Sequence, residues 1–164
     1  MNDGHPGVVA YSRYMALERT GWLEYGFCPH SPGEDESHIY YAKTLGHIYG
    51  FLGFVKQLCE FRGIDLDAVS LGMGMRGLRG KSLECIAEIG IREFWSVTPP
   101  EKDTLLMHRP SEDGEWTLDS VTKEFADNLL NHWEFARPGH FTATPEFKGS
   151  TYQGEFFRKS FHYW

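Results

Sequence analysis

Apolar residues recur along the chain with two different periods, one typical of helices and one typical of strands. Between residues 36 and 62 the apolar positions step by four and three residues, which predicts a long helix with one buried face. These positions are Tyr41, Leu45, Ile48, Leu52, Val55 and Cys59. We expect Ser31 or Asp35 to cap the start of this helix, and Gly63 to close its end.

Three glycines, Gly46, Gly50 and Gly53, lie inside this predicted helix. Each costs about 1 kcal/mol relative to alanine in a helix interior. Their presence favours a close approach by a neighbouring sheet or helix, with a ligand contact as the alternative.

A second amphipathic helix is predicted over residues 120–136. Its apolar face contains Val121, Phe125, Leu129, Trp133 and Ala136, and Asp119 or Ser120 is the expected cap.

Strand patterns occupy much of the remaining sequence. Val8–Leu17 and Trp22–Phe27 predict a β-hairpin, because both are rich in aromatic and β-branched residues and Gly21 suits the turn. Further strands are expected at Ala68–Leu71, Ile91–Val97 and Thr104–His108, and a short helix at Lys81–Ile89. The predicted fold class is therefore α+β, with a mixed or mainly antiparallel sheet packed against the long helix and the second helix.

Length and composition are those of one globular domain. The chain has 164 residues, of which 41% are hydrophobic and 24% charged. We expect a single α+β domain over residues 1–140, followed by a C-terminal arm over residues 141–164. The arm interleaves aromatic and basic residues, so we expect it to pack on the domain or on a partner, including a second copy in a homodimer. Contact with a ligand or a single-stranded nucleic acid is the alternative.

The net charge of −7 argues against a general binder of duplex DNA. No apolar run approaches the roughly 18 residues of a membrane span, and the first residues do not have the pattern of a secretion signal. The three cysteines are scattered, which is typical of reduced thiols in a cytoplasmic protein. We therefore expect a cytoplasmic protein that has no membrane partner.

A glycine-rich segment offers the main candidate for function. Residues 72–82 contain three glycines in a G-x-G-x-x-G pattern and three cations, followed by a serine. Glycines allow backbone N–H groups to approach an anion, and arginine can grip a phosphate with two hydrogen bonds. The predicted ligand-binding residues are Gly72, Gly74, Arg76, Gly77, Arg79, Lys81 and Ser82.

The same segment departs from the known phosphate-binding patterns. Met75 stands where a P-loop requires glycine, and the segment does not begin a strand–helix–strand unit. A twisted edge strand that pairs with Ile91–Val97 is the alternative interpretation.

Other groups of polar residues carry weaker predictions. Asp65 and Asp67 precede a predicted strand, and we expect them to lie in a solvated loop. A Mg²⁺ site that they form with a histidine is the alternative. Cys28 and His30, followed by His38, lack the paired spacing of a metal site. We expect no resident metal and no cofactor.

Four short stretches resemble a known family. They are Trp22-Leu23-Glu24-Tyr25, Phe61-Arg62-Gly63-Ile64, Ala68-Val69-Ser70-Leu71 and Gly77-Leu78-Arg79-Gly80. Their order over residues 8–136 is similar to the C-terminal region of bacterial Schlafen-AlbA-like ATP-binding proteins. The nucleic-acid-binding and nuclease-like portion of that family has no counterpart in this sequence. The resemblance therefore implies an accessory sensor or ligand-binding module in bacterial defence or regulation, without the family's activity.

Together these features predict a non-enzymatic module that recognises a nucleotide or a nucleic-acid phosphate. Two alternatives come from other classes. One is a metal-dependent phosphodiester hydrolase that uses Asp65 and Asp67, and the other is a homo-oligomeric assembly module.

Overall fold

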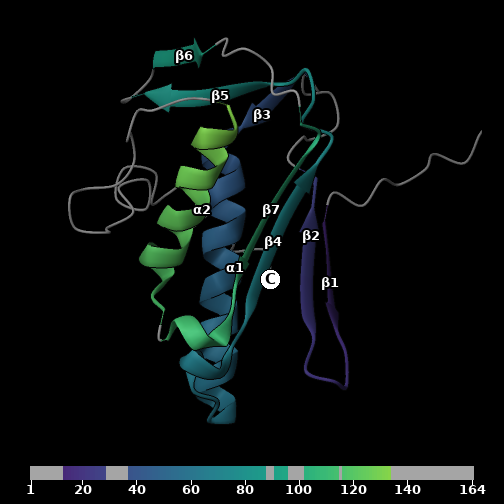
Figure 1. Cartoon of the computed structure of the whole chain (residues 1–164), viewed down its shortest axis with the longest axis vertical. Coiled ribbons are helices and arrows are strands. Elements are labelled where there is room, and N and C mark those ends of the chain that lie inside the picture. The colour runs from purple at the N-terminus through teal and green to yellow at the C-terminus, as the bar shows by residue number, and fades with distance from the viewer. Residues whose placement is uncertain (1–12, 29–36, 88–90, 96–101, 115, 134–164) are drawn as a thin grey trace, which may run out of the picture.

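The computed structural model describes residues 13–28, 37–87, 91–95, 102–114 and 116–133. These residues form two α-helices, two short 3-10 helices and seven strands in three small sheets, as Figure 1 shows. The helices are α1 (Tyr41–Arg62), α2 (Leu118–His132), η1 (Leu66–Ala68) and η2 (Ser111–Asp113). The strands are β1 (Arg13–Leu17), β2 (Leu23–Phe27), β3 (His38–Tyr40), β4 (Leu71–Arg76), β5 (Ser82–Ala87), β6 (Ile91–Trp95) and β7 (Thr104–Arg109). The α+β fold class is confirmed.

The strands pair mainly with antiparallel neighbours. β1 pairs with β2 as the predicted hairpin, and β4 pairs with β7. β5 lies at the centre of the third sheet, where it is antiparallel to β6 and parallel to β3. Figure 1 shows α1 and α2 side by side, the β4–β7 pair against them, the β1–β2 hairpin beyond that pair, and the third sheet across one end.

The core forms along the predicted face of α1. Tyr41, Leu45, Ile48, Leu52, Val55 and Cys59 are all buried, as their spacing requires. Gly63 ends the helix with a φ of +65°, and the Ile64 N–H donates to the Cys59 carbonyl at 2.9 Å. This is the Schellman closure that glycine favours. The expected caps Ser31 and Asp35 lie outside the described residues.

The second helix is confirmed, but its predicted cap is wrong. Val121, Phe125, Leu129 and Trp133 are buried, while the helix begins at Leu118 and is capped by Thr117. The Ser120 N–H donates to the Thr117 hydroxyl and the Thr117 N–H to the Ser120 hydroxyl, each at 3.0 Å. This reciprocal pair satisfies two N–H groups that have no partner within the helix. Asp119 and Ser120 are not the cap, because both lie inside the first turn of α2.

The predicted start of the long helix near residue 36 is wrong, because His38–Tyr40 pair with β5 as strand β3 and α1 begins at Tyr41. Two further predicted elements are also wrong. The expected short helix at Lys81–Ile89 is strand β5, because extended backbone there gains ladder hydrogen bonds from β3 and β6 on both edges. The expected strand at Ala68–Leu71 is a 3-10 turn followed by the start of β4. In this turn the Ala68 N–H donates to the Asp65 carbonyl at 3.1 Å.

Several predicted positions lie outside the described residues. They are residues 8–12 of the hairpin, 96–97 of the strand that follows residue 90, Ala136 of the second helix, and the C-terminal arm 141–164.

The described geometry of α1 does not require a glycine at position 53. A Cβ built on Gly53 meets Leu118 Cδ2 at 3.8 Å, which is an ordinary van der Waals contact. Because alanine restricts the unfolded chain more than glycine, we expect Gly53→Ala to raise the free energy of unfolding by about 0.5–1 kcal/mol. Urea denaturation measures this change.

Gly63→Ala is the control, because it adds the same methyl group at a positive φ. It should lower the free energy of unfolding by about 1 kcal/mol. A loss of stability in Gly53→Ala comparable with that of the control would show that the space beside Leu118 does not admit a methyl group.

Candidate functional site

The glycine-rich segment forms a strand and a turn, and its first part is not a loop. Gly72 and Gly74 lie in β4 opposite His108 and Leu106 of β7. The segment therefore pairs with β7, and the predicted pairing with Ile91–Val97 is wrong. A Cβ on Gly74 would approach Leu106 Cδ2 to 2.9 Å, so this glycine admits the neighbouring side chain.

The turn that follows uses its backbone amides within the chain. Gly77 and Gly80 both have a φ of +73°, a conformation that favours glycine. The amides of Leu78 and Arg79 donate to the carbonyl and the carboxylate of Asp103, at 3.1 and 3.2 Å. The Lys81 amide donates to the Leu78 carbonyl at 3.1 Å. These amides are thus already committed, and the buried Leu78 side chain anchors the turn in the core.

The polar side chains of the glycine-rich segment differ in their exposure and in their hydrogen bonds. Arg76 and Arg79 are exposed, and Lys81 is half-buried. Ser82 forms a short hydrogen bond with Nδ1 of His38, and its amide donates to the Ser37 carbonyl at 2.9 Å. Ser82 therefore joins β5 to β3, while the cations are the part of the predicted anion site that still faces solvent.

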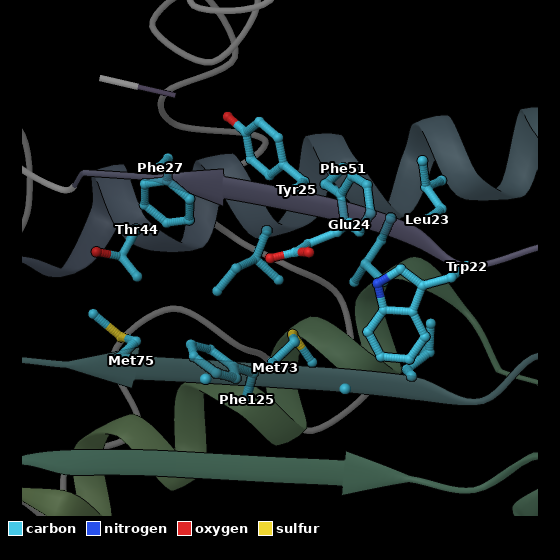
Figure 2. A pocket seen from close by; sticks show the side chains of 15 residues that line it. Trp22, Leu23, Glu24, Tyr25, Phe27, Thr44, Phe51, Met73, Met75 and Phe125 are labelled. Carbon is cyan, nitrogen blue, oxygen red and sulfur yellow. The ribbon is translucent and has the colours of Figure 1, made fainter. Parts of the chain in front are cut away.

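A cleft opens between β2 and β4, and we call it the β2/β4 cleft. It has a volume of about 140 Å³, and α1 forms its floor. Figure 2 shows its walls, with Tyr25 and Phe27 on one strand and Met73 and Met75 on the other. Two predicted ligand-binding residues, Gly72 and Gly74, also line it. Of the predicted site residues, the structure therefore brings these two glycines to a cavity.

The two strands that flank the cleft are not paired with each other. Among the described strands, β2 pairs only with β1, and β4 only with β7. In a two-stranded sheet, alternate N–H and C=O groups of each strand point away from its partner. Both strands run in the same direction, from the side of Trp22 and Met73 to the side of Phe27 and Met75 (Figure 2). Two parallel strand edges therefore border one cleft.

Thr44 supplies a polar group in the floor of the cleft. Its side chain is fully buried, and its Oγ1 has no hydrogen-bond partner among the described residues. An unsatisfied buried hydroxyl costs about 1–3 kcal/mol. A bound polar group that reaches Thr44 would recover part of this free energy.

An aromatic cluster fixes β2 on α1. The Phe27 ring stacks on the His47 ring with centroids 4.3 Å apart, and the Tyr25 ring stacks on Phe51 at 5.3 Å. The Tyr25 hydroxyl also forms a 2.7 Å hydrogen bond with His47 Nδ1. Burial, together with the positive charges of Lys43 and Arg13, lowers the pKa of His47 to about 4. The imidazole is therefore neutral near pH 7.

The structure does not bring the other candidate metal ligands together among the described residues. Asp65 is the N-cap residue of η1 and Asp67 lies within it, just after the C-terminal end of α1, and both side chains are exposed. Within the described part of the chain, no group of three or more His, Cys, Asp or Glu side chains is placed to hold a metal ion. Cys28 is an exposed free thiol, and His30 lies outside the described residues.

No helix among the described residues is long and apolar enough to cross a membrane.

Comparisons with protein-family models, with curated proteins and with solved structures found no match. The resemblance to Schlafen-AlbA-like proteins stays a prediction.

Sequence reasoning missed Thr44, His47 and the β2 wall of the cleft. The alternation of Leu23, Tyr25 and Phe27 indicates one apolar strand face, as does that of Leu71, Met73 and Met75. Both faces lie on α1, but alternation does not indicate that the two strand edges stay apart.

The lowered pKa of His47 predicts a pH-dependent stability. In the unfolded chain the histidine takes up its proton near pH 6.5, whereas the folded protein resists protonation down to about pH 4. The unfolded state therefore binds more protons in this window, and stability is lost as the pH falls from 6.5 to about 4. We expect His47→Gln to reduce this loss, measured as Tm against pH.

The matched control is His108→Gln, which changes an exposed histidine on β7. It should retain the wild-type dependence of Tm on pH. Equal slopes in both variants and in the wild type would show that His47 does not resist protonation in the fold.

Proposed function

We propose that this chain is a non-enzymatic binding module whose ligand is an extended peptide strand received in the β2/β4 cleft. The observation that carries the proposal is the pair of strand edges that border one apolar cleft. An extended peptide can pair its backbone with an exposed strand edge, while alternate side chains enter pockets. In this cleft, a single bound strand could pair with β2 on one side and with β4 on the other.

The direction of the bordering strands favours one orientation of the ligand. Because β2 and β4 run the same way, a peptide antiparallel to one is antiparallel to both. It would join the two hairpins into a single antiparallel sheet in the order β1, β2, peptide, β4 and β7. Antiparallel pairs are slightly more stable per residue than parallel pairs.

The walls of the cleft favour particular side chains in the ligand. Residues that point inward would meet Ile48, Phe51 and Leu52 of α1, so they should be apolar. On the opposite face, a Cβ built on Gly72 meets nothing within 4 Å. This leaves room for a large ligand side chain above the glycine, an arrangement known to stabilise glycine in sheets.

A lysine in the cleft tests this proposal. Met73 is half-buried and lines the cleft, so Met73→Lys places a charge where the apolar face of the peptide would lie. Leu106→Lys is the matched control, because Leu106 is 76% exposed on the paired strand β7. We expect Met73→Lys to weaken binding about tenfold or more, with the control within about twofold of wild type.

The ligand for this measurement is a synthetic peptide of about ten residues that alternates valine with threonine or lysine. Isothermal titration calorimetry measures its Kd. A second peptide with proline at alternate positions lacks the N–H groups that would pair with one of the two strands, so it should bind about tenfold or more weakly than the first. Equal binding of both peptides, or equal weakening by both variants, would overturn the proposal.

A nucleotide is the second candidate ligand, and the position of Arg76 favours it. Arg76 is exposed and directly follows Met75, which lines the cleft. A base could stack on the aromatic wall while Arg76 and Arg79 contact the phosphates.

Arg76→Ala combined with Arg79→Ala tests the nucleotide. If a nucleotide raises the Tm of the wild type, this double variant should lose the increase, because its phosphates lose their cationic partners. Lys56→Ala, which changes a partly exposed lysine on α1, is the control and should keep the increase in Tm. The same increase in the double variant would exclude Arg76 and Arg79 from the site.

A further inference from the structure

Two threonines of the described fold are fully buried, and they differ in their hydrogen bonding. The Thr122 hydroxyl of α2 donates to the Leu118 carbonyl one turn earlier, at 2.6 Å. This is a common way for a helical threonine to satisfy its hydroxyl inside a core. Thr44 of α1 is equally buried, but its Oγ1 has no hydrogen-bond partner among the described residues. Thr44 therefore has a hydrogen-bonding capacity that the described fold does not use.

Thr44 lies at one end of the β2/β4 cleft. Figure 2 shows its side chain between Phe27 of β2 and Met75 of β4. The Glu24 carboxylate and the Tyr25 hydroxyl also belong to the lining, but both already have hydrogen-bond partners within the chain. The Thr44 hydroxyl is therefore a buried polar group of the lining that is left for a ligand.

The volume of the cleft limits what can reach Thr44. At about 140 Å³, it is close to the size of an engineered protein cavity of about 150 Å³ that binds benzene. The cleft therefore holds one or two side chains of moderate size. Because the Thr44 hydroxyl is covered in the free protein, a ligand side chain reaches it only when a neighbour moves. Met75 can move in this way, since a methionine side chain is unbranched and adapts to its surroundings.

A second hydroxyl is the polar group that suits Thr44 best. Each hydroxyl has one donor hydrogen and two lone pairs, so two hydroxyls can pair with each other. An asparagine or glutamine side chain has two N–H donors and a carbonyl, which is more than Thr44 can satisfy. A carboxylate or ammonium group would bury a charge among the apolar side chains of Phe27, Ile48 and Met75.

From these observations we infer that Thr44 determines the specificity of the β2/β4 cleft. The ligand is then an extended peptide with serine or threonine at the inward position between Phe27 and Met75, and apolar residues at its other inward positions. The inference rests on the proposed function, because it names a side chain of the same peptide ligand. In the complex, the ligand hydroxyl supplies the hydrogen bond that Thr44 lacks in the free protein.

A hydroxyl scan of the synthetic peptide tests the inference. Each inward valine is replaced in turn by threonine, which has the same shape but carries a hydroxyl in place of a methyl group. Calorimetry measures the Kd of each peptide for the wild type and for Thr44→Val. At one position, the preference for threonine over valine should be about tenfold greater in the wild type than in Thr44→Val. At the other inward positions threonine should weaken binding to both proteins, because its hydroxyl is buried without a partner.

Two variants serve as controls for Thr44→Val. Thr44→Ser keeps the hydroxyl, so it should retain the preference for threonine. Thr122→Val removes the other fully buried threonine hydroxyl, which does not line the cleft, and should leave the preference unchanged. The Tm of the free proteins gives a second measurement. Thr44→Val should raise the Tm because it removes an unpaired hydroxyl, whereas Thr122→Val should lower it because it removes a hydrogen bond.

The outcomes separate this inference from the proposed function. If the peptides bind the wild type but Thr44→Val changes the preference at no position, the inference is wrong and the proposed function stands. A Tm of Thr44→Val below that of the wild type would show that the hydroxyl has a partner in the free protein, which also overturns the inference. If neither the valine peptide nor any threonine form binds the wild type, the proposed function is wrong as well.

Discussion

The described fold depends on the burial of one face of α1. Six apolar side chains, from Tyr41 to Cys59, form a continuous stripe along the helix, and all six are buried. The stripe is covered by α2, by the β4–β7 pair and by the inner face of β2, each contributing apolar side chains of its own. Because the hydrophobic effect has no preferred direction, it gathers these elements on the helix without determining how their edges meet.

The β2/β4 cleft follows from this arrangement. The two hairpins use their hydrogen bonds within each pair, and each lays an apolar face on α1. Their neighbouring edges face each other without pairing, while the aromatic stacking around His47 holds β2 in position. An exposed strand edge can form hydrogen bonds with another strand, and proteins commonly cover such edges or use them for binding. In the cleft, apolar side chains of the core therefore lie next to strand edges that have no partner strand among the described residues.

The spacing of apolar residues and glycines along the sequence predicts those features that depend on neighbouring residues. The spacing of Leu45, Ile48 and Leu52 was sufficient to identify the buried face of α1, and Gly21 and Gly63 indicated where a turn and a helix end. The pairing of β4 with β7 and of β3 with β5 joins segments far apart in the sequence, and no periodicity encodes it. For the glycine-rich segment, composition predicts an anion-binding loop, whereas Asp103 and β7 determine its conformation. The cleft could not be predicted, because it arises where two strands fail to pair.

The hydrogen bond between Trp133 and Lys81 has a consequence for biosynthesis. It joins residues 52 positions apart and lies in the part of the core that α2 completes. Residues 63–133 emerge from the ribosome after α1, and at 5–20 residues per second their synthesis takes roughly 4–14 s. During this interval the apolar stripe of α1 lacks its α2 cover, so the nascent chain exposes a surface of the kind that molecular chaperones bind.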